Sequence, residues 1–426
     1  MSHSTVPAPR PAGPAPRGAR ATPAEHVEHE RAIGDFYSEF PYPWHVTRLA
    51  RADDPTLHPA LVSQELGDFT GGRMPPGARI WVPGCGVNQA LIMALRFPSA
   101  TVVGSDVSEE SLRMCGAAAE QVGASNLVLR DEGITQASYR EEFDYIACTG
   151  VIHHCPNPGT LLERLGAALK PSGVVELMVY NTFHRREITA FQEAMRLIGR
   201  DQDLWYAKRL AAAFRTDNLL TRQIQAEVED PDVQFADTWL NPYEQTYTVA
   251  DLDGLAGRAG LELEAPCVSA VARSLESFMW EVPVADDRIR RQFHALDDLT
   301  RWRVSNLLLM DRSPLVWFYL RRADSPIPAT TEAERDERFL DAVMTRVSGT
   351  ERVWLLERAG GYRPLDRPAD LPAGRPAEFQ EVVDAVDGRR PVREVLEGLG
   401  GVPRPWTVRR MRTMLTTPTF PHLRAV

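Results

Sequence analysis

The strongest constraint on the fold is a regular alternation of short apolar segments with amphipathic segments between residues 79 and 180. The pattern predicts strands at 79–82, 100–104, 126–129, 143–148 and 174–180, and helices at 89–97, 109–121 and 158–169. Most of the strand segments are almost continuously apolar, as strands of a parallel sheet covered on both faces are. Strands that alternate with helices are typical of crossover connections. The sequence therefore predicts an α/β fold with a doubly wound sheet.

The rest of the chain is arranged around that sheet. A helix at 249–259 and strands at 261–265 and 315–319 continue the alternation. The resulting domain, 78–324, carries helical insertions near 181–246 and 270–312, which are of a size that often builds a lid over a substrate. The predicted flanking regions are a disordered tail at 1–22, a helical and aromatic cover segment at 23–77, and a small, mainly helical accessory C-terminal domain at 332–426.

Composition narrows the partners and the location. The formal net charge of -10 argues against a broad basic surface for nucleic acid. No apolar run approaches the roughly 18 residues that span a bilayer, so we expect no membrane partner. The cysteines lack the spacing of a metal site or a disulfide framework, which predicts a cytoplasmic protein without a metal. They are Cys85, Cys115, Cys148, Cys155 and Cys267.

A glycine pair lies where the first strand ends and a helix begins. Gly84 and Gly86 permit a tight turn and close approach of a ligand to the backbone, and the following helix offers unpaired N–H donors. Alone, this pattern also fits an ordinary turn. The second strand, however, ends at Asp106, about 20 residues later, the spacing at which an acid accepts hydrogen bonds from ribose hydroxyls. Because Ser108 is the better N-cap for the next helix, Asp106 is available for a ligand.

The third and fourth strands add further polar groups at the same edge. The third ends at Asp131 and Glu132, of which Asp131 is our preferred acceptor for an adenine amino group; a solvated loop is the alternative. The fourth ends at Thr149 and Gly150, and His153 and His154 follow shortly after.

In this order the motifs resemble those of the class I S-adenosylmethionine-dependent methyltransferase family, particularly its small-molecule branch. The quoted segments are Gly84-Cys85-Gly86, Asp106, Asp131, Phe143-Asp144, Gly150-Val151-Ile152-His153-His154 and Leu169-Lys170-Pro171-Ser172-Gly173. The resemblance is close over 80–180 and looser over 25–322. It implies a Rossmann-like sheet with S-adenosyl-L-methionine bound at Gly84, Cys85, Gly86, Asn88, Asp106, Val107, Asp131, Glu132, Thr149 and Gly150.

The sequence departs from the family pattern at two positions. Val82 replaces an acid that many relatives carry, so the ammonium of the cofactor loses one expected partner. Asn88 replaces a third glycine, and we expect its side-chain amide to compensate. A nicotinamide-dependent oxidoreductase is the nearest rival, but its fingerprint requires glycine at the position of Gln89. A catalytically silent cofactor-binding or scaffold protein is the other alternative.

The residues after the fourth and fifth strands are candidates for the chemistry. Methyl transfer from a sulfonium is an in-line displacement, which needs alignment and, for a protonated nucleophile, a base. His153, His154 and His184 are our candidate catalytic residues; packing against the cofactor or a loop is their alternative role. Tyr42, Trp44 and Tyr180 are expected to contact the substrate, although aromatic residues in such segments often only anchor the chain.

The predicted substrate is a small metabolite or natural-product-like molecule, with a peptide as the alternative. Because the Asn/Asp-Pro-Pro-aromatic turn of enzymes that methylate nucleic-acid bases is missing after the fourth strand, that substrate class is disfavoured. In the C-terminal domain the short helices resemble winged-helix modules, including those that grip leader peptides. Arg409, Arg410 and Arg412 form a basic cluster that suits either an acidic partner or an amphipathic packing helix.

Overall fold

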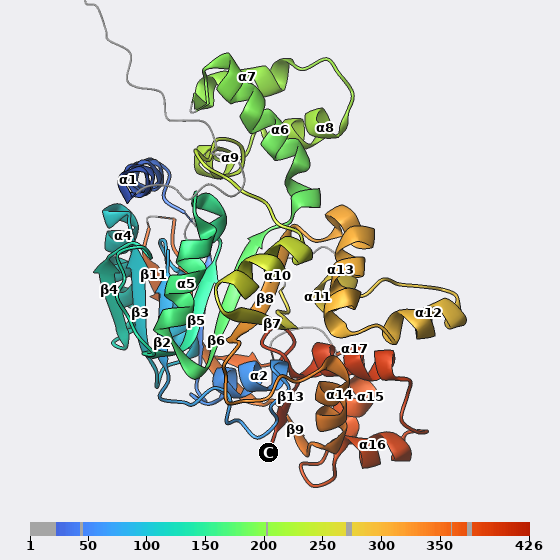
Figure 1. Ribbon diagram of the computed structural model, residues 1–426. Helices are drawn as coiled ribbons and strands as arrows, with labels where there is room; N and C mark the ends of the chain where they lie inside the picture. Colours follow the sequence, from blue (N-terminus) through green and yellow to red (C-terminus); the bar gives the residue numbers. More distant parts are fainter. Residues whose placement is uncertain (1–22, 43–45, 202, 270–274, 359, 373–376) are drawn as a thin grey trace, which may run out of the picture.

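The computed structural model describes residues 23–42, 46–201, 203–269, 275–358, 360–372 and 377–426 (Figure 1). The predicted tail at 1–22 and Trp44 therefore lie outside the described residues.

The centre of the molecule is a seven-stranded sheet in the spatial order β4-β3-β2-β5-β6-β8-β7. All of its strands run parallel except β8, which pairs antiparallel with both β6 and β7. The strands are β2 (Arg79–Pro83), β3 (Thr101–Asp106), β4 (Leu127–Asp131), β5 (Phe143–Thr149), β6 (Leu169–Tyr180), β7 (Leu261–Pro266) and β8 (Leu315–Arg322). Because β2, β3, β4 and β5 are parallel, their carboxyl ends meet at one edge.

Helices cover both faces of this sheet, so the predicted fold class is confirmed. One face packs against α2 (Leu57–Glu65), α3 (Gln89–Arg96) and α4 (Glu109–Val122). The other packs against α5 (Pro158–Ala168), α10 (Val249–Arg258) and α13 (Asp298–Leu309). Each face buries its own apolar core, as a doubly wound sheet requires.

Two helical segments interrupt the sheet sequence. Four helices follow β6 and enclose a separate apolar core: α6 (Thr182–Ile198), α7 (Leu204–Ala213), α8 (Leu219–Glu227) and α9 (Asp232–Trp239). Figure 1 shows that they project beyond the sheet as a group. Between β7 and β8 lie α11 (Leu275–Met279), α12 (Asp287–His294), α13 and the 3-10 turn η2 (Met310–Arg312).

The N-terminal segment begins with α1 (Pro23–Glu39), which packs against α4 and lies above the edge of the sheet in Figure 1. A short strand follows, β1 (Arg48–Ala52). Within the predicted cover segment at 23–77, α2 begins at Leu57, and no pattern indicated β1.

The C-terminal region is mainly helical, as predicted, but it also contains short strands. Its elements are α14 (Glu332–Asp341), β9 (Met344–Arg346), β10 (Gly349–Leu356), β11 (Tyr362–Pro364), β12 (Ala369–Leu371), α15 (Gln380–Ala385), α16 (Val392–Gly398), α17 (Pro405–Thr416) and β13 (Leu423–Ala425). β10 pairs antiparallel with β1, so one small sheet joins the N-terminal segment after α1 to the C-terminal region. Among the described residues, no helix is long and apolar enough to cross a membrane.

Candidate functional site

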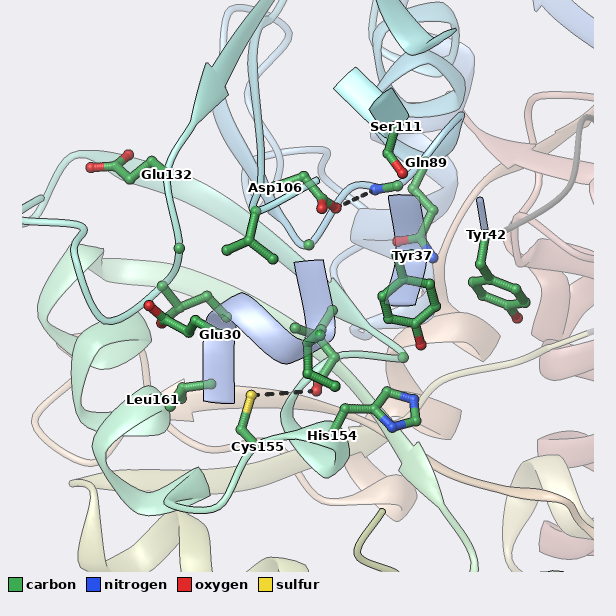
Figure 2. Close-up of a pocket in the computed structure, with 18 of the residues that line it drawn as sticks. Glu30, Tyr37, Tyr42, Gln89, Asp106, Ser111, Glu132, His154, Cys155 and Leu161 are labelled. Atoms are coloured by element: carbon green, nitrogen blue, oxygen red, sulfur yellow. Dashed lines mark hydrogen bonds between the residues drawn. The ribbon is translucent and has the colours of Figure 1, made fainter. Parts of the chain in front are cut away.

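A pocket opens at the carboxyl ends of β2, β3, β4 and β5 and is covered by α1 (Figure 2). It has an empty volume of about 810 Å³, which includes the part open to solvent. Its lining residues are His29, Glu30, Ile33, Tyr37, Tyr42, Gly84, Gly86, Gln89, Asp106, Val107, Ser111, Glu132, Gly133, Ile134, Thr149, Gly150, Val151, His154, Cys155 and Leu161.

The glycine loop forms one wall. Gly84 and Gly86 have φ values of +60° and +52°, a left-handed conformation that other residues rarely adopt. A Cβ atom on Gly84 would lie 2.6 Å from Cγ2 of Val151, so the loop and the segment after β5 are in close contact. The side chain of Cys85 is buried behind the loop and does not line the pocket.

Asp106 connects this loop to the second strand of the site. Its carboxylate accepts hydrogen bonds from the backbone N–H of Gly86 at 2.8 Å and of Ser108 at 2.9 Å. Ser108 caps α4 by accepting from Ser111 N, which is the capping role predicted for it. Burial raises the pKa of Asp106. Since an ionised carboxylate offers about four lone-pair sites, Asp106 can still accept hydrogen bonds from a ligand in the pocket.

The two acids after β4 differ in position. Glu132 lines the pocket, and its carboxylate accepts from the hydroxyl of Tyr139 at 2.8 Å. Asp131, the acid preferred from the sequence, is exposed and does not line the pocket. A further acid comes from α1, because Glu30 lines the same end of the pocket and accepts from the hydroxyl of Thr135.

The residues after β5 complete the floor. Thr149 and Gly150 line the pocket, as does Val107 after β3. The Thr149 hydroxyl donates to Oε1 of Gln89 at 3.0 Å. Gln89, which occupies the position where a dinucleotide-binding fingerprint requires glycine, therefore lies in the pocket wall. Asn88 is buried and does not line the pocket.

The structure separates the three candidate histidines. His154 lines the pocket, and its Nδ1 lies 2.9 Å from the carbonyl of Tyr243. His153 is buried behind it, and neither of its ring nitrogens has a hydrogen-bond partner among the described residues. Burial lowers the pKa of His154 to about 4 and lowers the pKa of His153 as well, so both are weak bases. His184 lies in the first turn of α6, outside the pocket lining.

Only one of the two described aromatic residues that were predicted to contact the substrate lies in the pocket wall. Tyr42 lines the pocket, whereas Tyr180 does not. The ring of Tyr180 lies between the imidazole of His153, 3.9 Å away between ring centroids, and Arg185, whose Cζ is 3.9 Å from the ring centroid. Arg185 in turn forms a buried ion pair with Glu244. Tyr180 therefore lies behind the pocket and contacts the beginning of α6.

Sequence reasoning missed the contribution of α1. His29, Glu30, Ile33 and Tyr37 line the pocket from this helix. The sequence predicted a helical cover segment at 23–77, but it did not specify which of these residues would face the pocket.

The pocket carries a distinctive charge. Its described lining includes three acids, Glu30, Asp106 and Glu132, and no lysine or arginine. The nearby guanidinium of Arg185 is already paired with Glu244. Such a site favours cationic and neutral ligands over polyanions.

Comparisons with known proteins agree with this geometry. A family model described as a methyltransferase domain matches residues 83–175. The trans-aconitate 2-methyltransferase of Variovorax paradoxus is 33% identical over 137 residues, which are 32% of this chain and 49% of that protein. The chain thus spans about half the length of this relative.

Two further proteins match over a greater length. A Synechococcus protein, syc1184_c, described as uncharacterized, is 26% identical over 77% of this chain and 79% of its own length. The structure of PKMT2 from Rickettsia typhi in complex with AdoHcy is similar with a TM-score of 0.54 at 14% identity, over 83% of this chain and 72% of that chain. At this identity the structural similarity concerns the fold.

Proposed function

The chain belongs to the class I S-adenosylmethionine-dependent methyltransferases, and from this premise we propose that it methylates a small acceptor that carries no negative charge. The observation that carries the proposal is one pocket that joins the glycine loop, Asp106 and Glu132 at the carboxyl edge of the sheet, with no lysine or arginine in its described lining.

The residues of the pocket fit the cofactor. The left-handed glycines leave room at the loop for its amino-acid part, the Asp106 carboxylate is available to the ribose hydroxyls, and Glu132 or Glu30 is available to the adenine amino group. The acidic lining also suits a cofactor with a sulfonium and an ammonium group. When bound, S-adenosylmethionine supplies an electrophilic methyl group, and the pocket residues have to orient the acceptor and exclude water.

The chemical class of the acceptor is inferred from the part of the pocket that the cofactor would not fill and from the charge of its lining. The pocket has to hold both the cofactor and the acceptor, and α1 contributes lining residues that cover it, which favours a small molecule over a peptide. A carboxylate-rich acceptor such as trans-aconitate, the substrate named for the Variovorax relative, would meet three acids and no lysine or arginine in the described lining. Tyr37, Tyr42 and His154 instead offer aromatic surfaces to a ring or an amine.

We retain several predictions as proposals. They are the domain boundaries at 23–77, 78–324 and 332–426, with β1 and β10 forming the contact between the first and the last, and a cytoplasmic location suggested by the scattered cysteines.

Calorimetric titration with S-adenosylmethionine tests the proposed cofactor site. We expect saturable binding to the native chain and a loss of about ten- to a hundredfold in affinity for Asp106→Ala, because a hydrogen bond to a charged group contributes about 1.5–3 kcal/mol. Asp131→Ala is the matched control, since it removes an exposed acid from the end of the neighbouring strand. Absence of binding, or preference for NADH, contradicts the proposal.

A further inference from the structure

A buried carboxyl group lies just behind the tyrosine end of the pocket. Asp237, on α9, is 5% exposed, and its Oδ1 accepts a hydrogen bond from the Tyr37 hydroxyl at 3.3 Å. Tyr37 is itself a lining residue, so its phenol connects the pocket to Asp237. Catalytic hydrogen bonds are often long in a ligand-free site and shorten when substrate binds, so this length does not exclude Asp237 as a proton acceptor.

The Tyr37 hydroxyl group accepts one hydrogen bond and donates another. The side-chain amide of Asn241 donates to Oη of Tyr37 at 3.0 Å, and Oη donates to Asp237. A phenolic oxygen has two lone pairs and one hydrogen. One lone pair is therefore still available for a donor in the pocket when Asp237 is ionised.

Tyr37 lies on the side of the pocket where we expect the acceptor to bind, opposite the side expected for the adenine of the cofactor. Figure 2 shows Tyr37, Tyr42 and His154 on one side of the pocket and Glu132 on the other, with Asp106 between them. A cofactor bound along Glu132, Asp106 and the glycine loop would leave the tyrosine side for the acceptor.

From this geometry we propose that Tyr37 and Asp237 form a proton relay for an acceptor that carries a hydroxyl group, a proposal that rests on the proposed function. The acceptor hydroxyl gives its proton to Oη of Tyr37 while Tyr37 passes its own proton to Oδ1 of Asp237. The electron pair of the broken O–H bond forms the new bond from oxygen to the methyl carbon, and the carbon–sulfur pair stays on the departing sulfur. Asp237 then returns its proton to water.

The charged surroundings give Asp237 a suitable basicity. Burial raises its pKa to about 7, Arg185 opposes that rise, and Glu244 adds to it. Tyr37, Tyr42 and Tyr180 are the other titratable groups facing it, from α1, the segment after α1 and β6. A base with a pKa near the working pH is the most effective, whereas burial lowers the pKa of His153 and His154 and makes them weaker bases.

The experiment uses 4-methylphenol and its methyl ether, 4-methylanisole, as probes of the full chain saturated with S-adenosylhomocysteine. Ionised Asp237 holds the Tyr37 hydrogen and leaves Oη to accept from the phenol. Protonated Asp237 can instead donate to Oη, so that the Tyr37 hydrogen turns into the pocket, where the ether can accept it. We expect the ratio of the two affinities, phenol over ether, to rise by about tenfold or more as the pH passes from one unit below to one unit above the pKa of Asp237, because the protonated fraction that the ether requires falls about tenfold over that interval.

Two variants and one control make the result specific. Asp237→Asn and Tyr37→Phe should each abolish the pH dependence of the ratio, while Asp232→Asn, at an exposed position in the first turn of α9, should preserve it. A ratio that is independent of pH, an unchanged rise in Asp237→Asn, or no binding of either probe overturns the relay. Failure of S-adenosylhomocysteine itself to bind would instead count against the proposed function.

Discussion

At the scale of single residues, we expect the proposed site to tolerate little change at a few backbone and carboxyl positions. Gly84 combines a left-handed backbone with a close neighbour, and Asp106 fixes two backbone N–H groups at the end of β3. Both were identified from the sequence, because a strand that ends in glycines and a second strand that ends in an acid are local patterns.

Gly84→Ala tests the close contact. We expect it to lower the free energy of unfolding by about 1–2 kcal/mol for the left-handed backbone and by about a further 1–3 kcal/mol for the overlap with Val151. Gly123→Ala is the control, because Gly123 has a φ of +68° and nothing within 4 Å of its Cβ position. Urea unfolding measures both. If the overlap is real, Val151→Ala should partly rescue Gly84→Ala; equal losses for the two glycines would show that it is absent.

A buried glutamate outside the site predicts a pH effect on stability. Burial raises the pKa of Glu65 to about 8, although its carboxyl group accepts hydrogen bonds from Val268 N and the Tyr319 hydroxyl. The folded state therefore binds one proton more than the unfolded state between the ordinary pKa and about pH 8. The stability that Glu65 contributes is complete below the unfolded pKa and is lost as the pH rises through the folded pKa.

Glu65→Gln removes this titration. We expect the free energy of unfolding of the variant, relative to the native chain, to increase by about 2 kcal/mol between pH 6 and pH 8, since one pKa unit corresponds to about 1.36 kcal/mol. Urea unfolding at several pH values provides the measurement, with Glu141→Gln, an exposed glutamate, as the control. Parallel pH profiles for the native chain and Glu65→Gln would refute the assignment.

At the scale of elements, packing of α17 buries most of the basic cluster that the sequence shows. Of the three arginines in its basic cluster, Arg409 and Arg412 are buried against α14, where both donate to Asp336 at 3.1 and 2.9 Å. Arg409 also donates to Glu281, from the insertion after β7. Of the two roles open at the sequence level, the structure thus favours a packing helix over a surface for an acidic partner.

Asp336→Ala tests this ion-pair network. Removing one partner of a buried pair leaves uncompensated charge, so we expect the free energy of unfolding to fall by about 3–5 kcal/mol. The neighbouring Glu337 pairs with Arg393 at an exposed position, and Glu337→Ala should cost less than about 1 kcal/mol. Denaturant unfolding of the two variants gives the comparison, and similar losses would mean that the buried network contributes no more than the exposed pair.

Some elements of the fold could be predicted from the sequence, and others could not. The sheet strands were found because they are nearly continuous apolar runs between clear turns. β1 was missed because Arg48-Leu49-Ala50-Arg51-Ala52 has no such run and its partner, β10, lies about 300 residues away in the sequence. Tyr37 and Asp237 were missed for a related reason, since they are 200 residues apart in the sequence and meet only where α1 contacts α9 behind the pocket.

At the scale of the whole molecule, the contacts between the ends of the chain predict shared stability. Trp354 and Tyr362, from β10 and β11, pack in the same apolar core as α3 and α4. The amide of Gln64, on α2, donates to the carbonyls of Thr416 and Leu423 at 2.9 and 3.2 Å. These contacts make independent opening of the C-terminal region unfavourable, because it would expose one face of the core.

Hydrogen exchange of the full chain measures that coupling. A ligand present at a hundredfold excess over its dissociation constant stabilises the binding-competent state by about 2.7 kcal/mol. If the C-terminal region opens only together with the sheet, S-adenosylhomocysteine should slow exchange in β2 and in α17 by the same factor, although α17 supplies no residue to the described pocket lining. A response confined to β2 would instead show that residues 332–426 unfold as a separate unit, and that the small sheet of β1 and β10 is a contact between two independent domains.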